Sequence, residues 1–191
     1  MRRFLTNVFA LLLSGVAATF AITAYAKESV KIVFIGPLTG GNSALGLGGR
    51  NSADLAVHLR NADPKAKYGY ELLKLDDQCK PDIGVQVATK AGADNSIIAG
   101  VTHYCSAVAI ATVDTYHKFG LPVIVWGAVL PAITYGNDLP ELHRVNGTMI
   151  NQNEATARLV TGLGYNTWCT IHDTPQHDTS RDAPTPTSLN Q

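Results

Sequence analysis

Short apolar runs rich in β-branched residues alternate with segments of helical periodicity along the first 130 residues of the chain. The apolar runs, bounded by glycine, proline or polar turns, predict four strands at 30–35, 70–76, 97–101 and 121–126. Apolar residues recur every three or four positions between them, which predicts helices at about 45–61, from Pro81 onward, and at 106–119. This alternation favours βαβ units, so the expected fold class is α/β with a parallel sheet.

The same periodicity predicts which helix faces are buried. The inner face of the helix at 45–61 is expected to carry Leu47, Ala53, Ala56, Val57 and the stem of Arg60. That of the helix at 106–119 is expected to carry Ala109, Ile110, Val113 and Tyr116. A loop at 131–140, a short strand at 142–145, a helix at 151–163 and a strand at 167–173 complete the predicted order.

The first 26 residues have the pattern of a cleavable signal peptide. Arg2 and Arg3 form a positive segment, an apolar stretch follows at 8–22, and Ala24-Tyr25-Ala26 forms an A-x-A cleavage site. We therefore expect export and a mature chain that begins at Lys27. An uncleaved membrane anchor is the alternative, although the apolar stretch is barely long enough to span a bilayer.

Composition narrows the class of protein. A chain of 191 residues with 46% hydrophobic content supports one core rather than two. The 15 basic and 15 acidic residues give a formal net charge of zero without a basic stripe, so no nucleic-acid partner is expected. The six histidines are scattered without the spacing of zinc ligands, and no metal or other cofactor is expected.

The strands at 97–101 and 121–126 each end in a short turn, and a helix begins between them at Ser106. Small molecules bind open parallel sheets outside the carboxyl ends of the strands, which is where this serine is predicted to lie. Its hydroxyl can cap the helix, and the free N–H groups of the first helical turn can hold a carboxylate. An N-cap without any binding role explains the same spacing.

Exported proteins can keep disulfides, and the chain has three cysteines. Cys79 and Cys105 each follow a predicted strand and so belong to the same edge of the sheet, where a bridge could form. Closing that loop would stabilise the fold by roughly 3–4 kcal/mol. Cys169 lies in the predicted strand at 167–173 and is expected to be a buried free thiol.

Three other kinds of site match parts of the sequence, but each lacks a residue or an arrangement that it needs. The glycine-rich loop after the first strand is similar to a phosphate-binding loop, but Asn42 stands where such a loop needs lysine. Cys105 with His103 could serve an exported hydrolase-like enzyme, yet no residue that would orient the histidine is evident. Asp76 and Asp77 could form an acid–base or metal pair, but neighbouring strand residues point to opposite faces, which favours turn capping. An enzyme is therefore not the expected function.

Several motifs are typical of one family. They lie at 33–40, 75–81, 103–106, 119–122 and 143–145, with a further match at 171–173. Over about residues 30–174 the sequence resembles the periplasmic solute-binding proteins of branched-chain amino-acid ABC transporters, the Leu/Ile/Val-binding family with the type I periplasmic binding fold. The paired cysteine segments, with a serine after the second, are the most specific part of this resemblance.

The resemblance implies capture of an amino acid or related small carboxylate between two lobes, and delivery to an ABC permease in the inner membrane. It implies a periplasmic location and a monomer. It places ligand binding at Ser106, Ala107, Gly127, Val129 and Leu45, where Ser106 and main-chain groups at Gly127 receive the ligand carboxylate. Val129 and Leu45 stand where the family often has a hydroxyl and an aromatic residue, which leaves room for an aromatic carboxylate.

The resemblance also implies a Cys79–Cys105 disulfide and a division of the chain. The expected parts are a signal peptide at 1–26, an incomplete N-terminal βα lobe at 27–147, the start of a second lobe at 148–173, and a disordered tail at 174–191. The tail is rich in proline and nearly free of aliphatic residues, unlike the family. A truncated or frame-shifted product with impaired binding is therefore expected. A ligand-sensing ectodomain on the same fold is the alternative.

Overall fold

The computed structural model describes residues 27–136, 138–165 and 167, so the predicted signal peptide, tail and Cys169 lie outside the described residues, as does nearly all of the predicted strand at 167–173. The elements follow the predicted order, and their ends agree with the predictions to within two residues. They are β1 (Ser29–Gly36), α2 (Ser43–Ala62), β2 (Gly69–Asp76), α3 (Pro81–Gly92), β3 (Ile97–Thr102), α4 (Ser106–Phe119), β4 (Val123–Val125), the 3₁₀ turn η1 (Pro131–Ile133), β5 (Leu142–Arg144) and α5 (Met149–Gly162).

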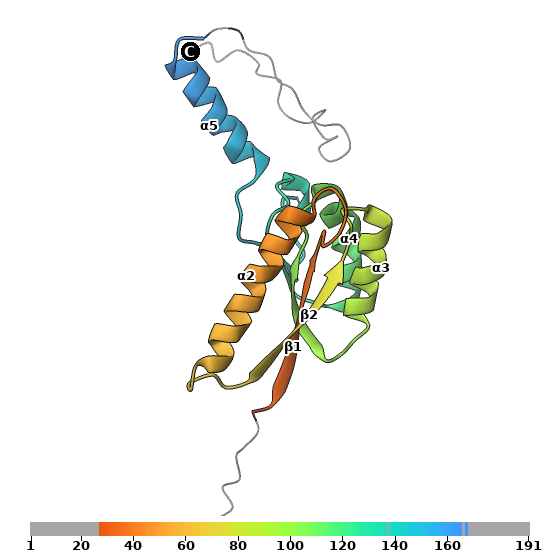
Figure 1. Ribbon diagram of the computed structural model, residues 1–191. Coiled ribbons are helices and arrows are strands. Elements are labelled where there is room, and N and C mark those ends of the chain that lie inside the picture. Colours follow the sequence, from red (N-terminus) through yellow and green to blue (C-terminus); the bar gives the residue numbers. More distant parts are fainter. Residues whose placement is uncertain (1–26, 137, 166, 168–191) are drawn as a thin grey trace, which may run out of the picture.

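Five parallel strands form one sheet in the order β2-β1-β3-β4-β5 (Figure 1). The chain continues from β1 to one side of the sheet and from β3 to the other, so its direction reverses between these two neighbouring strands. Helix α2 covers β1 and β2 on one face, while α3 and α4 pack together on the other face. The predicted α/β fold is confirmed, and the carboxyl ends of all the strands lie along one edge.

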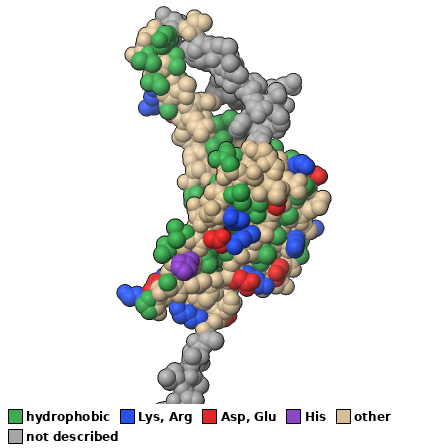
Figure 2. Space-filling model, viewed as in Figure 1, with side chains coloured by type: hydrophobic (Ala, Val, Ile, Leu, Met, Phe, Trp, Pro, Cys, Tyr) green, Lys and Arg blue, Asp and Glu red, His purple; other side chains and the backbone are tan. Residues whose placement is uncertain are grey.

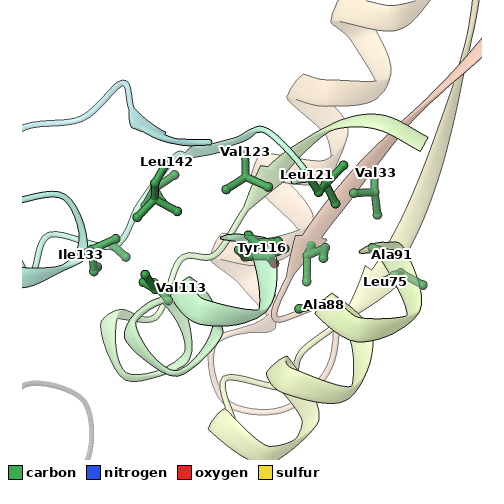
Figure 3. Packing of buried hydrophobic residues seen from close by; sticks show 14 of the residues in the cluster. Val33, Leu75, Ala88, Ala91, Val113, Tyr116, Leu121, Val123, Ile133 and Leu142 are labelled. Carbon is green, nitrogen blue, oxygen red and sulfur yellow. The ribbon is translucent and has the colours of Figure 1, made fainter. Parts of the chain in front are cut away.

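The hydrophobic core lies between the sheet and helices α3 and α4 (Figure 3). Val33 and Ile35 of β1 belong to it and are fully buried, and Tyr116 of α4 lies in its middle with 1% of its surface exposed. Strand residues alternate between the faces of a sheet, so Phe34 points to the opposite side, toward α2. The sheet is therefore apolar on both faces, as parallel sheets usually are.

Two predicted helix faces are only partly correct. On α2, Leu47, Ala53 and Val57 are partly buried, but Ala56 and Arg60 are exposed. On α4, Ala109, Val113 and Tyr116 are buried, but Ile110 is 40% exposed. In the described part of the chain α2 packs mainly on β1 and β2 and α4 mainly on α3, so each helix buries a narrower stripe than its apolar pattern suggests.

Helix α5 buries none of its residues and stands apart from the sheet (Figure 1). Its start is stabilised by Asn151, whose Oδ1 accepts a hydrogen bond from the Thr148 N–H at 3.0 Å. Hydrophobic side chains are visible on its surface in Figure 2, and Leu159 and Leu163 are each 63% exposed. Within the described ranges, every helix is too short or too polar to cross a membrane.

Candidate functional site

A disulfide and a buried hydrogen-bond chain tie together the loops at the carboxyl edge of the sheet. The disulfide joins Cys79, which follows β2, to Cys105, which follows β3, with 5.6 Å between their Cα atoms. The predicted pairing is therefore present in the structure. Because a disulfide sulfur is not a thiolate, Cys105 cannot be the nucleophile of the hydrolase-like alternative.

The hydrogen-bond chain runs through the fully buried side chain of His103. Its Nδ1 lies 2.9 Å from Asp77 Oδ2, and its Nε2 lies 2.7 Å from the Tyr116 hydroxyl. A carboxylate only accepts hydrogen bonds, so His103 Nδ1 carries a proton and donates to Asp77. Burial raises the pKa of Tyr116, which keeps this hydroxyl protonated. His103 therefore links the loop after β2 to α4, and it does not act as a base toward Cys105.

The backbone of His103 makes further links. Its N–H donates to the Ile35 carbonyl of β1 at 2.9 Å, and its carbonyl accepts the N–H of Gly127 at 3.3 Å. Its φ angle is +55°, in the left-handed region that is costly for a residue with a side chain. Gln78 and Cys79 have the same conformation, with φ angles of 51° and 58°. Strained backbone is thus found where the cross-links hold the loops.

Ser106 is the first residue of α4 and not its N-cap, which is Cys105 in an extended conformation. The prediction that the Ser106 hydroxyl caps the helix is therefore wrong. Ser106 Oγ instead accepts hydrogen bonds from the N–H groups of Val129 at 3.2 Å and Leu130 at 3.3 Å. These backbone groups lie at a packed edge and need an acceptor, which the buried serine supplies. Ser106 thereby fastens the loop after β4 to the start of α4.

Two N–H groups at the start of α4 have no hydrogen-bond acceptor among the described residues, those of Ser106 and Ala107. The next two, of Val108 and Ala109, donate to the Cys105 carbonyl at 3.2 and 3.0 Å. The Ser106 hydroxyl accepts two bonds, and its own hydrogen is not used by either. Three donors and the positive end of the helix dipole therefore form a place that suits one carboxylate.

Arg144 and Asn146 hold the loop that faces these donors. The Arg144 guanidinium donates from Nη1 to the Ala128 carbonyl at 3.1 Å and from Nη2 to the Leu130 carbonyl at 2.8 Å. Asn146 Nδ2 donates to the same Ala128 carbonyl at 3.0 Å. Partial burial lowers the pKa of Arg144, yet an arginine stays charged at neutral pH. These bonds fix the backbone whose N–H groups reach Ser106.

Four of the five predicted ligand residues lie near the start of α4. Ser106 and Ala107 begin the helix, Val129 donates to Ser106 through its N–H, and Gly127 lies two residues before Val129. The Gly127 N–H already donates to a carbonyl, so the donors without an acceptor are those of Ser106 and Ala107. Leu45 lies near the start of α2 and is 50% exposed. Ligand binding by all five residues stays a prediction.

Two aromatic residues, Tyr104 after β3 and Trp126 after β4, lie at the same edge. Their ring centroids are 5.5 Å apart. The Trp126 ring packs so closely on Gly49 of α2 that a Cβ there would lie 2.9 Å from it. The Tyr104 ring lies over Gly127, where an added Cβ would lie 2.7 Å from Cδ2 of the ring. Glycine is therefore required at both positions.

Asp76, the last residue of β2, connects three loop segments. Its carboxylate accepts hydrogen bonds from the Leu38 N–H at 2.8 Å, from the Gln78 N–H at 2.9 Å and from the Thr39 hydroxyl. Partial burial alone would raise the pKa of this carboxyl, but the hydrogen bonds outweigh it, and the pKa lies below its usual value. Asp77 Oδ1 likewise accepts the Cys79 N–H at 2.9 Å. The predicted turn-capping role of both aspartates is confirmed.

Sequence reasoning missed the roles of Arg144, Asn146 and the aromatic pair. Arg144 was expected as part of a short strand and of the motif at 143–145, without a role in holding a loop, and Trp126 only as the end of a strand. A usable signal was present for Arg144, because an arginine in a strand of a buried parallel sheet needs hydrogen-bond partners. Among the described residues, no group of three or more His, Cys, Asp or Glu side chains is placed to hold a metal ion.

The structure is an α/β lobe with a parallel sheet whose strand order reverses between β1 and β3, and the candidate site lies at the carboxyl edge of that sheet. The sequence profile of the periplasmic binding protein family matches residues 29–185, which is well over half of the chain. The chain therefore belongs to the periplasmic binding protein family.

Similar proteins come from several bacteria. An amino acid binding protein of Pseudomonas aeruginosa is 29% identical over 121 residues, which are 63% of this chain and 32% of that protein. The branched-chain amino acid transporter substrate binding protein LivJ of Streptococcus pneumoniae, solved with isoleucine, has a TM-score of 0.59 and 24% identity over 63% of this chain and 34% of its own. An ABC transporter solute binding protein of R. palustris, solved with benzoate, has a TM-score of 0.65 and 22% identity over 72% of this chain and 38% of its own.

These solved structures show a shared fold at low sequence identity. The chain spans about a third of the length of the relatives that it matches, between 32% and 38% in these three. The relatives are binding proteins by their descriptions, and not enzymes. Both an aliphatic amino acid and an aromatic acid occur as ligands among them.

Proposed function

We propose that this protein is the periplasmic substrate-binding component of an ABC transporter, which captures an amino acid or a related small carboxylate for uptake. Membership of the periplasmic binding protein family and the ligands of the similar structures support this function. The signal-peptide pattern of the first 26 residues supports a periplasmic location. A permease in the inner membrane is the corresponding partner.

The observation that carries this proposal is the pair of N–H groups without an acceptor at the start of α4, beside the Ser106 hydroxyl. A carboxylate is the common feature of amino acids and small organic acids, and a helix N-terminus with free N–H groups favours a negative charge. The first turn of α4 contains no acidic residue that would occupy the donors. The ligand would therefore place its carboxylate here, whatever the rest of the molecule is.

We expect modest affinity from the described residues alone. The described residues contact a ligand from one edge of one sheet, whereas tight small-molecule sites bury most of the ligand surface. We expect dissociation constants of roughly 1 mM, about 4 kcal/mol of binding free energy. A method that detects weak binding is therefore needed.

The test is a chemical-shift titration of the isotope-labelled full chain with leucine, phenylalanine and benzoate, with the matching primary amide, benzamide, as a control. The expected result is a saturable shift of the Ser106 and Ala107 amide resonances with at least one acid and none with benzamide, since the donors need a negative charge. Acids that leave these two resonances unchanged up to about ten times the expected dissociation constant would refute the proposal.

A further inference from the structure

We infer that Tyr104 and Trp126 form the wall on which an aromatic ring of the ligand packs, so that aromatic carboxylates are the preferred substrate class. This inference rests on the proposed function, because it adds a ring contact to the same carboxylate site. It concerns the part of the ligand that the donors of Ser106 and Ala107 do not reach.

The position of the pair in the fold is the first argument. In an open parallel sheet the ligand crevice lies outside the carboxyl ends of the two strands between which the strand order reverses. Here these strands are β1 and β3, which end at Gly36 and Thr102. Tyr104 is the second residue after β3, and the Trp126 ring reaches over Gly36, where an added Cβ would lie 3.3 Å from Cζ2 of the indole. Both rings therefore lie at the carboxyl ends of these two strands, where such a fold places its ligand.

The second argument is the partial exposure and the fixed orientation of the two rings. Both side chains are only partly buried, unlike the fully buried Phe34, whose ring centroid lies 5.7 Å from that of Trp126. The Trp126 Nε1 lies 3.5 Å from the Ile35 carbonyl, which orients the indole. The Tyr104 hydroxyl has no hydrogen-bond partner among the described residues. The rings thus form a fixed surface that still has exposed area, and aromatic rings prefer such offset or tilted partners.

The third argument is that the ring surface and the carboxylate donors adjoin the same loop. The Tyr104 ring lies over Gly127, and two residues later Val129 donates its N–H to Ser106 Oγ. The ring wall and the donors therefore border the same short segment of chain. Val129, at the end of this segment, has an apolar side chain. An acid with a flat apolar ring directly attached to its carboxylate fits this arrangement.

The experiment compares benzoate with cyclohexanecarboxylate, which has the same charge and ring size but no π system. The full chain carries Trp168→Phe, so that the Trp126 indole N–H is the single tryptophan resonance, and both acids are titrated by NMR. We expect tighter binding of benzoate and a shift of the Trp126 indole resonance.

The Trp126→Leu variant is titrated in the same way and followed at the Ser106 amide. Benzoate binding should weaken by roughly two- to tenfold, the range of one aromatic contact. Cyclohexanecarboxylate binding should stay within about twofold of its value in the parent.

Phe119→Leu is the matched control, because it removes a ring at the other end of α4 and should leave both acids unaffected. Tyr104→Leu replaces Trp126→Leu if the latter does not fold, with the same expectation. Equal weakening of both acids, or unchanged benzoate binding, would overturn the inference. So would binding of leucine without binding of benzoate, although the proposed function would then stand. A chain that binds no acid at all would refute both.

Discussion

Ser106 combines two tasks that sequence reasoning treats as alternatives. Its oxygen accepts the N–H groups of Val129 and Leu130, and its own N–H remains without an acceptor among the described residues. The structural role therefore leaves the Ser106 N–H available. One buried serine holds the loop after β4 in place, and the proposed carboxylate site uses a different group of the same residue.

Replacing Ser106 with alanine tests this dual role. The Val129 and Leu130 N–H groups would lose their acceptor, so we expect the free energy of unfolding to fall by about 1–3 kcal/mol, measured by urea denaturation. Ser52→Ala, on the exposed surface of α2, is the control and should change stability by less than about 0.5 kcal/mol. Equal stability of the two variants would show that the loop does not depend on the serine.

Asp76 gives the protein a pH-dependent component of stability. Its pKa is lower in the folded protein than in the unfolded chain, so its contribution is fully present above about pH 5 and is lost as the pH falls through the folded-state pKa. Asp76→Asn should therefore be less stable than the parent by about 1 kcal/mol at pH 7, with a difference that shrinks below about pH 4. Denaturation curves of both proteins between pH 7 and 3 measure this, and a constant difference would contradict it.

At the scale of elements, the contact between α3 and α4 depends on one glycine. A Cβ at Gly84 would lie 2.3 Å from Cγ1 of Val108, which is fully buried and has little room to move. The sequence pattern of α3 predicts its buried face from Ile83, Val87, Ala88 and Ala91 but does not show that this glycine lets the two helices approach. The close packing positions the start of α4, and with it Ser106, at the edge of the sheet.

Two glycine-to-alanine variants separate packing from helix propensity. Gly84→Ala should lower the free energy of unfolding by about 1–3 kcal/mol, because the added methyl group overpacks the contact between the helices. Gly48→Ala in α2 adds a methyl group with no atom within 4 Å. It should raise stability by about 0.5–1 kcal/mol, since alanine favours the helix. Calorimetric melting of both variants checks the opposite signs, and a stabilised Gly84→Ala would mean that the helices can shift apart.

At the scale of the whole molecule, much apolar surface stays uncovered among the described residues. Leu55 and Leu59 are one turn apart on α2 and are 57% and 61% exposed, and Ile124 of β4 is 40% exposed. Figure 2 shows hydrophobic side chains between the charged ones on the visible face. Neighbouring exposed apolar side chains, such as Leu55 and Leu59, promote non-specific association.

The double variant Leu55→Gln, Leu59→Gln should reduce that association, because it replaces the exposed apolar pair with polar side chains that still suit a helix. Light scattering at increasing protein concentration measures the effect. Ile110→Gln is the control, since a single exposed apolar side chain is common on protein surfaces and should matter little. Similar scattering of the double variant and the parent would show that other surfaces drive association.

The order, type and approximate ends of the elements follow from the sequence alone, because hydrophobic periodicity and turn residues act over a few positions. The parallel sheet, the helix that begins at Ser106 and the edge shared by Cys79 and Cys105 were predicted on this basis. Local patterns also explain the errors, because the apolar stripe of a helix shows which residues can be buried and not how much of the stripe a neighbour covers, as Ile110 and Ala56 illustrate.

Only the tertiary structure decided which side chains meet. His103 pairs with Asp77 and Tyr116, 26 and 13 residues away, and Ser106 meets the Val129 N–H, 23 residues away. These contacts depend on the strand order and on the face to which each crossover helix packs, and neither is encoded in a short window of sequence. The sequence by itself determined the elements, and it predicts a ligand site at the carboxyl edge of the sheet. The arrangement of donors, links and rings at that place was settled by packing, because it joins backbone and side-chain groups from separate loops at the carboxyl edge of the sheet.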